Sequence, residues 1–401
     1  MRPGDGNASD GNGGSDAVIR ISQIKLPVSH GPEELEKKAA KLLRLRPQEI
    51  VSLTIVRRSL DARKRGGLSY IYCVDVAVRG EEETVLRRVK SPEIARAPRE
   101  TYRLPAPGGE PLGVRPLIAG FGPAGMFCAL MLARAGYRPL ILERGADVDT
   151  RAAIVKRFWD GGPLDPECNV QFGEGGAGTF SDGKLNTLVR DPSGRNREVL
   201  RIFAEAGADP AITYVAKPHV GTDALRRVVK NIREEILRLG GEIRFGWKLA
   251  DLELEGGTLR AVLAEHGAGR ERIPAQALVL AIGHSARDTF VMLQDRRLNL
   301  EPKAFAVGLR IQHPQAQINR IQYGMEDPGA LGAASYKLTA RTGSGRGVYS
   351  FCMCPGGFVV NASSEAGRLA VNGMSNHDRG GENANSALIV TVTPDDFPEP
   401  G

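Results

Sequence analysis

Residues 116–144, PLIAGFGPAGMFCALMLARAGYRPLILER, decide the fold of this chain. The apolar run 117–119 predicts a buried strand, a glycine-rich turn follows it, and the periodicity of residues 126–135 predicts a helix. A second apolar strand then ends at Glu143. This order of strand, turn, helix and strand is that of a dinucleotide-binding βαβ unit. The sequence therefore predicts an α/β fold built on a Rossmann-like unit.

Each glycine of the turn has a physical reason to be there. Gly120 permits the tight turn, Gly122 lets the backbone approach a pyrophosphate, and Gly125 allows close packing of helix on strand. The phosphates would then lie at the helix N-terminus. Glu143, which lies 143 − 120 = 23 positions after the first glycine, would accept hydrogen bonds from a ribose 2′-hydroxyl.

Composition limits the class of protein. The 401 residues suffice for about two or three domains, and the net charge of +7 does not predict a dedicated nucleic-acid binder. No apolar run is long enough to cross a bilayer, and the polar residues 1–16 predict a disordered tail rather than a secretory signal. Five cysteines without a C-x-x-C pair favour the cytoplasm, with no structural disulfide or metal site.

Periodicity changes along the chain predict three domains. Residues 17–103 alternate between strand and helix patterns and predict an α+β domain. Residues 104–300 contain the Rossmann-like unit, and residues 301–401 contain alternating runs that predict an inserted antiparallel β domain. In the first domain the loop with Arg63, Lys64 and Arg65 joins two strands. A solvated hairpin tip is favoured there over an RNA contact, because no aromatic residues are interleaved with the charges.

Two further features point to a larger cofactor site. The stretch 170–185, VQFGEGGAGTFSDGKL, contains a second formal G-x-G-x-x-G but lacks a preceding strand and a following helix. It predicts a glycine loop whose backbone N–H groups could face an anion or a flavin ribityl chain. Later the strand VLAIG ends at Gly283, and ligands of open α/β sheets bind at the carboxyl ends of strands.

The chain resembles a family of bacterial NAD(P)/FAD-dependent oxidoreductases, often called uncharacterised FAD-dependent dehydrogenases, with a glutathione-reductase-like FAD fold. The resemblance rests on GFGPAGMFCALMLARAG with LERG, GEGGAGTFSDGKL, AVGLRIQHPQ and YSFCMCPGGFVVNASSEAGRLAVNGMS. It implies FAD as the cofactor. Members of that family continue further and complete the flavin site with a late strand, so the resemblance also implies that this chain is C-terminally truncated.

The resemblance implies the following FAD contacts, position by position. The pyrophosphate and adenosine ribose would lie on Gly120, Gly122, Pro123, Ala124, Gly125 and Glu143, with Arg144 beside the adenosine, Lys248 and Leu249 near the adenine, and Gly283 near the cofactor. The ribityl and isoalloxazine side would face Gly175, Gly176, Thr179, Ser181 and Gly183.

Flavin enzymes leave the hydride chemistry to the cofactor, so catalytic residues need not form a motif. Lys184 and Arg310 are candidates because a cation stabilises reduced flavin, and His284 and His313 because histidine titrates in the useful range. Surface or structural roles are equally open for each.

Cys352 and Cys354 form a C-x-C pair. On an extended strand their side chains would share a face roughly 7 Å apart, too far for a disulfide without backbone movement. A packing role is therefore expected. The paired redox cysteines that disulfide reductases carry early in the FAD unit are also missing, and Cys168 stands alone there.

The leading hypothesis is an FAD-dependent oxidoreductase that transfers hydride or electrons between a reductant, with NAD(P)H as the candidate, and a small-molecule substrate. A nicotinamide-only dehydrogenase is the second hypothesis. The predicted strands of residues 248–276 before VLAIG disfavour it, because FAD-binding folds contain such strands and simple dehydrogenases lack them. A non-catalytic nucleotide- or RNA-binding protein is the third. The sequence determines neither the substrate nor the oligomeric state.

Overall fold

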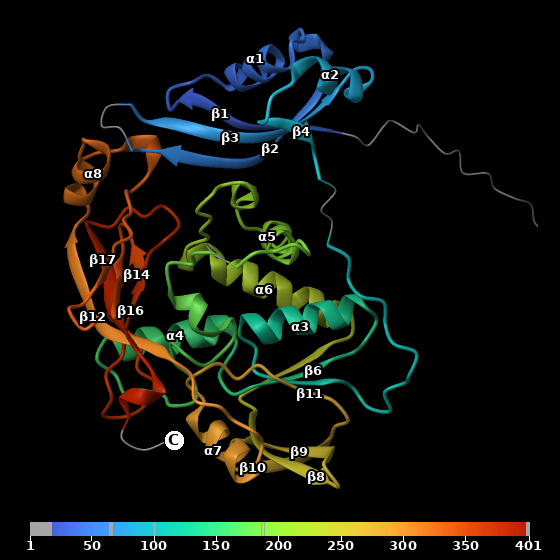
Figure 1. The fold of residues 1–401 in the computed structure, drawn as a ribbon. Coiled ribbons are helices and arrows are strands. Elements are labelled where there is room, and N and C mark those ends of the chain that lie inside the picture. Colours follow the sequence, from blue (N-terminus) through green and yellow to red (C-terminus); the bar gives the residue numbers. More distant parts are fainter. Residues whose placement is uncertain (1–17, 64–66, 99–101, 186, 188, 398–401) are drawn as a thin grey trace, which may run out of the picture. The chain divides into compact units, whose positions relative to one another are not determined.

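The computed structural model describes residues 18–63, 67–98, 102–185, 187 and 189–397, which form two compact units (Figure 1). The first unit falls within residues 1–100 together with Tyr214–Ala216, and the second comprises 101–213 and 217–401. The second unit therefore holds both the predicted FAD-binding part and the predicted antiparallel part. The predicted disordered tail, residues 1–16, lies outside the described residues.

The first unit is a β-α-β-β-α-β fold with an antiparallel sheet in the order β2-β3-β1-β4. Its elements are β1 (Ile19–Pro27), α1 (Pro32–Leu43), β2 (Ile50–Asp61), β3 (Ser69–Val78), α2 (Glu82–Val89) and β4 (Ile94–Arg96). Both helices pack on one face of this sheet, because Leu35 of α1 and Val85 of α2 share a core with β1 and β3. The α+β character is confirmed, and α2 and β4 were not predicted.

The basic hairpin between β2 and β3 is described only in part. Arg63 donates hydrogen bonds of 2.8 and 2.9 Å to the Asp61 carboxylate, whereas Lys64 and Arg65 lie outside the described residues. An arginine paired with its own strand end fits the solvated hairpin tip that was favoured.

The centre of the second unit is a parallel sheet in the order β11-β5-β6-β7. The fingerprint supplies β5 (Leu117–Ala119), α3 (Pro123–Arg134) and β6 (Leu140–Glu143), as predicted. The remaining elements of this part are α4 (Val148–Trp159), α5 (Arg195–Glu205), α6 (Thr222–Arg238), β7 (Glu242–Phe245), β11 (Leu278–Leu280) and α7 (Arg287–Asp295). A three-stranded antiparallel sheet is inserted between β7 and β11, with β8 (Lys248–Glu255), β9 (Thr258–His266) and β10 (Gly269–Pro274).

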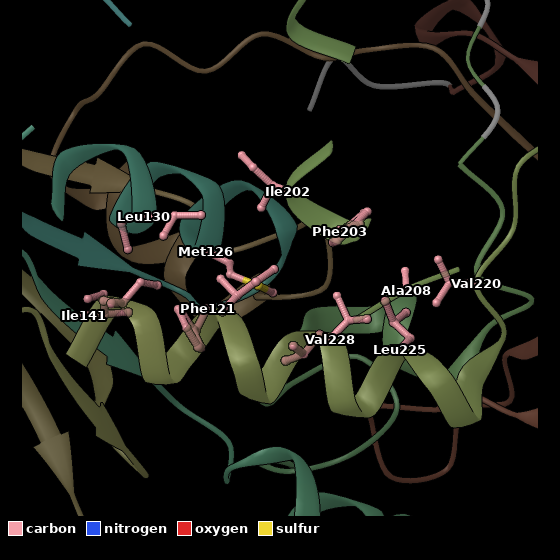
Figure 2. Packing of buried hydrophobic residues seen from close by; sticks show 14 of the residues in the cluster. Phe121, Met126, Leu130, Ile141, Ile202, Phe203, Ala208, Val220, Leu225 and Val228 are labelled. Carbon is pink, nitrogen blue, oxygen red and sulfur yellow. The ribbon is translucent and has the colours of Figure 1, made fainter. Parts of the chain in front are cut away.

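One hydrophobic core fixes the fingerprint helix. Figure 2 shows Met126 and Leu130 of α3 together with Phe121 and Ile141 beside α6, which contributes Val228. Apolar residues three and four positions apart place one face of each helix in this core. The helix α6 is thus a core element with one apolar face, and it holds α3 against the sheet.

A second sheet follows, antiparallel, in the order β12-β17-β14-β13. Its strands are β12 (Phe305–Pro314), β13 (Thr339–Arg341), β14 (Gly347–Cys354) and β17 (Asn383–Val392), accompanied by α8 (Gln315–Tyr323) and a β15 (Phe358–Asn361) and β16 (Val371–Met374) pair. The antiparallel pattern is confirmed. The apolar residues 387–392 belong to β17, which pairs with β12 on one side and β14 on the other.

In the described part of the chain, we find no helix that is both long enough and apolar enough to cross a membrane.

Candidate functional site

The glycine turn between β5 and α3 is built as the fingerprint predicts. Gly120 has a φ of 100°, and a Cβ there would overlap the carbonyl oxygen of Ala281. A Cβ at Gly125 would overlap the carbonyl oxygen of Gly120, so the helix lies directly on the turn. Gly122 is the N-cap of α3, and no side chain of a described residue caps that helix. The amides of its first turn therefore point at open space in front of the turn.

That space is a cavity of about 670 Å³ at the carboxyl ends of the parallel strands. Ala119 of β5, Glu143 of β6 and Leu280 of β11 line it, as expected for a ligand site of an open α/β sheet. The predicted cofactor residues that line the cavity are Gly120, Gly122, Pro123, Ala124, Glu143, Arg144, Gly176, Lys248, Leu249 and Gly283. His284, a predicted catalytic residue, lines it as well.

The second glycine loop packs on the first. Gly175 donates its N–H to the carbonyl oxygen of Phe121 at 2.9 Å, and a Cβ at Gly176 would lie 3.0 Å from the Cα of Gly122. Residues 176–178 line the cavity at the start of a short 3₁₀ helix, Gly176–Phe180. The loop thus forms a second wall opposite the N-terminus of α3, without the Rossmann helix that its glycine spacing formally allows.

The other predicted loop residues lie behind this wall and are not among the described residues that line the cavity. The Thr179 hydroxyl donates to the carbonyl oxygen of Glu174 at 3.3 Å, and the Ser181 hydroxyl donates to that of Gly178 at 2.7 Å. Gly175 and Gly183 have φ angles of 80° and 67°, so they bend the loop. Gly125 packs directly against the carbonyl oxygen of Gly120, so it supports the turn without being among the described residues that line the cavity. Direct cofactor contact by these five residues stays a prediction.

Glu143 has a structural role that was not predicted. Its buried carboxylate accepts backbone N–H groups from Phe121 at 2.7 Å, Gly145 at 2.9 Å and Gly173 at 2.9 Å. These three amides belong to the fingerprint turn, the turn after β6 and the glycine loop. One carboxylate therefore holds together three loops of the cavity wall, and the predicted ribose contact would be made by the same group.

Charged and aromatic side chains form the wall near the start of β8. Arg144 donates to Glu167 at 2.8 Å and to Asp288 at 2.7 Å, and its guanidinium lies 4.3 Å from the ring centroid of Phe172. Lys248 lies 3.3 Å from the same Glu167 carboxylate. Both predicted cations are thus paired within the protein, so they neutralise this wall rather than leaving a free positive charge.

Trp247 and Phe172 are lining residues that were not predicted from the sequence. The Trp247 ring stacks on His266 with centroids 3.9 Å apart. Trp247 directly precedes the strand predicted to pass the adenine, and this position could have indicated a lining role, since flat aromatic rings often line nucleotide sites.

Arg151 is a fully buried side chain beside the glycine loop that sequence reasoning missed. It is fully buried in α4 and donates to the carbonyl oxygens of Asn169, Val170, Gly173 and Glu174. Burial lowers its pKa to about 10, so it remains charged at neutral pH. Its position three residues after Val148 and four before Val155, both buried, was the signal that it faces the interior.

A partly buried polar cluster follows the glycine loop, defined by Asp182, Lys184, His219, Ser375 and Arg379, of which Asp182 and Ser375 are fully buried. Asp182 is buried and accepts hydrogen bonds from Ser375 and, at 2.8 Å, from Arg379, and it pairs with Lys184 at 3.3 Å. Although burial opposes ionisation, these cations and the hydroxyl lower the pKa of Asp182. Burial lowers the pKa of His219 to about 4, so this imidazole is neutral at physiological pH.

The predicted catalytic residues are distributed over different parts of the second unit. His284 lines the cavity, Lys184 belongs to the polar cluster, and His313 contacts the Tyr336 hydroxyl at 3.1 Å. Burial lowers the pKa of His313. Arg310 donates to the carbonyl oxygen of Cys352 at 3.2 Å. A catalytic role for each of these residues stays a prediction.

The expected separation of Cys352 and Cys354 is wrong. The pairing of β14 with β17 shifts between Phe351 and Cys354, and Cys352 has a φ of 45°. This bulge turns both side chains toward each other and brings their Sγ atoms to 3.9 Å. The estimate of roughly 7 Å assumed a regular extended strand.

Comparisons with known proteins identify a family model and a relative of this chain. A family model described as "FAD-dependent protein, C-terminal domain-like" matches residues 304–400, and a domain of unknown function matches residues 18–77. An uncharacterized protein of Clostridium beijerinckii is 48% identical over 382 residues, which cover 95% of this chain and 70% of that protein.

Solved structures give distant likenesses only. A geranylgeranyl bacteriochlorophyll reductase-like protein from Thermoplasma acidophilum matches with a TM-score of 0.37 and 10% identity, over 71% of this chain and 58% of that one. A glycerol-3-phosphate dehydrogenase from Bacillus halodurans, complexed with FAD, matches with a TM-score of 0.35 and 12% identity, over 69% and 47%. The 48% identity over 70% of the relative is decisive: the chain belongs to the same protein family as its clostridial relative, and within it residues 304–400 match the FAD-dependent C-terminal domain model.

Proposed function

We propose that this chain is an FAD-dependent oxidoreductase, which transfers hydride or electrons between a reductant such as NAD(P)H and a small-molecule substrate. When bound, FAD would supply the redox chemistry by accepting or giving up two electrons. The residues of the chain would bind it, orient it and keep water from part of its surface.

The observation that carries this proposal is that two glycine segments line the cavity, the turn with Gly120 and Gly122 and the loop of residues 176–178. Gly122 and Gly176 lie close together at this cavity, where a Cβ at Gly122 would be 3.6 Å from the Cα of Gly176, and the uncapped N-terminus of α3 opens on the same space. Backbone N–H groups and a helix dipole suit a pyrophosphate, and any side chain at these glycines would fill the space it needs. Glu143 stands at the end of β6, where a ribose hydroxyl would be accepted.

The inserted sheet supports FAD over a nicotinamide cofactor as the resident group. The sheet β10-β9-β8 separates β7 from β11, and Trp247, Lys248 and Leu249 at its start line the cavity. These residues would extend the site beyond a simple βαβ unit and cover the adenine. NAD(P)H would then act as a passing reductant rather than a bound cofactor.

Replacing Gly122 with alanine tests this directly. The φ of −74° suits any residue, and the new Cβ would lie 3.6 Å from the Cα of Gly176, an ordinary contact. We therefore expect normal folding. The methyl group would nevertheless occupy space between the glycine wall and the helix N-terminus, so FAD affinity should fall about tenfold or more, equivalent to about 1.4 kcal/mol. Titration of the protein with FAD, followed by flavin fluorescence, measures this.

Gly109→Ala is the matched control. No atom lies within 4 Å of a Cβ built at Gly109, and this glycine does not line the cavity. Its affinity for FAD should equal that of the parent chain. Equal FAD binding by the parent, Gly122→Ala and Gly109→Ala would place the pyrophosphate elsewhere and would reject this site.

A further inference from the structure

The bulge in β14 brings two thiols together in a backbone conformation that is unfavourable for cysteine. Cys352 has a φ of 45°, a region in which a Cβ is strained. Arg310 donates to its carbonyl oxygen at 3.2 Å, and the Sγ atom of Cys354 lies 3.2 Å from the same oxygen. The two Sγ atoms lie 3.9 Å apart, so closing them to a disulfide bond requires a movement of about 2 Å. The backbone strain thus serves to place the thiols within reach of each other.

The two thiols differ in access. Cys354 is fully buried, whereas Cys352 is partly exposed. A reagent from solvent can therefore reach Cys352 first. A mixed disulfide formed at Cys352 would then lie beside the buried thiol of Cys354.

The charges around the pair also differ in their effect on each thiol. The hydrogen bond from Cys354 lowers the pKa of Cys352 against the effect of burial, and Lys184 and Arg310 lower it further, while Asp182 opposes them. The same hydrogen bond, together with burial, raises the pKa of Cys354. Cys352 is therefore the thiol that gives up its proton first, and thiolates are the nucleophiles of disulfide exchange.

We propose that Cys352 and Cys354 form a redox-active dithiol that reduces small, accessible disulfides, with Cys352 as the attacking thiol and Cys354 as the resolving thiol. This site is independent of FAD binding. In the first step the Cys352 thiolate attacks one sulfur of a disulfide R–S–S–R, forms a mixed disulfide and releases one thiolate, which takes up a proton. In the second step Cys354 loses its proton and attacks the Sγ of Cys352, which releases the second R–SH. The dithiol is oxidised by two electrons and the small disulfide is reduced to two thiols.

The 401-residue chain, fully reduced, is treated with 5,5′-dithiobis(2-nitrobenzoate), and released nitrothiobenzoate is followed by absorbance. Peptide mass spectrometry then reads the fate of each cysteine. We expect Cys352 to react at least about tenfold faster than Cys73 and Cys128, which have no thiol partner among the described residues. The peptide holding Cys352 and Cys354 should end two hydrogens lighter and carry no nitrothiobenzoate.

Single substitutions separate the two roles. Cys354→Ser should keep the fast reaction but retain nitrothiobenzoate on Cys352, because no resolving thiol remains. Cys352→Ser should lose the fast reaction. Stable label on Cys352 of the parent chain, or a Cys352 that reacts no faster than Cys73, would overturn the proposal. The result on the parent chain decides the matter even if a variant fails to fold.

The pH profile adds a readout that a packing role would not change. Lys184 is a positioning residue here, and Lys184→Met should move the midpoint of Cys352 reactivity to higher pH, while Lys184→Arg should restore it. The other groups that face the thiol, Arg310, Asp182 and Cys354, stay unchanged in both variants. An unchanged midpoint in Lys184→Met would remove this cation from the proposal and count against an activated Cys352.

Discussion

Arg151→Met is expected to lower the free energy of unfolding by about 3–5 kcal/mol, because the substitution removes a buried charge that four carbonyl groups share. Arg151 donates to the carbonyl oxygens of Asn169 at 2.9 Å, Val170 at 2.9 Å and Glu174 at 2.6 Å. Methionine fills a similar volume without a donor, so these carbonyl groups would remain buried and unsatisfied. Urea unfolding followed by circular dichroism measures the loss.

Arg157→Met is the control for this prediction. Arg157 lies on the same helix, α4, but is exposed, so its replacement should change the free energy of unfolding by less than about 0.5 kcal/mol. The Arg151 variant should also bind FAD more weakly, because the carbonyl groups belong to the segment that leads into the glycine loop. Equal stability of the two variants would show that Arg151 does not support the loop.

Glu143→Gln is expected to lower both stability and cofactor affinity. The carboxylate accepts three backbone N–H groups, and an amide in its place must turn its NH₂ group toward at least one of them. The loss of charge-assisted hydrogen bonds should cost about 2–3 kcal/mol in unfolding free energy. Because the three loops line the cavity, FAD affinity should fall at least about tenfold. Chemical unfolding and FAD titration measure the two effects on one sample.

Glu255→Gln supplies the comparison. Glu255 is an exposed carboxylate at the end of β8, with 76% of its side chain accessible, and it pairs with Arg260 at 2.9 Å. Its replacement should cost less than about 1 kcal/mol and leave FAD binding unchanged. If Glu143→Gln behaves like Glu255→Gln, the carboxylate does not hold the cavity wall together.

The fingerprint could be predicted because its physics is local. The apolar runs of β5 and β6, the glycines of the turn and the periodicity of α3 each follow from neighbouring residues. The same holds for α6, whose apolar face has helical spacing. Contacts that depend on distant segments could not be predicted in this way. β17 is a central strand only because β12 and β14 flank it, and no local signal gives that partnership.

The site was predicted in outline and missed in its supporting groups. Gly120, Gly122, Gly125 and Glu143 were found because the fingerprint fixes their spacing, and all of these but Gly125 line the cavity. Arg151 was missed because an arginine in an amphipathic helix is ordinarily placed on the solvent face. The approach of Cys352 and Cys354 was missed because a bulge and a positive φ depend on the pairing of two strands. A distance inferred from sequence spacing assumes regular strand geometry, and the backbone at Cys352 departs from that geometry.

The central claim is that the cavity between the two glycine segments holds FAD. The most direct test is to add FAD to the purified 401-residue chain, remove free cofactor by desalting, and record the absorbance spectrum. The account predicts a yellow protein that retains flavin in equal molar amount, and a Gly122→Ala variant that retains clearly less. A colourless protein that takes up no FAD, also when titrated by calorimetry, would contradict it.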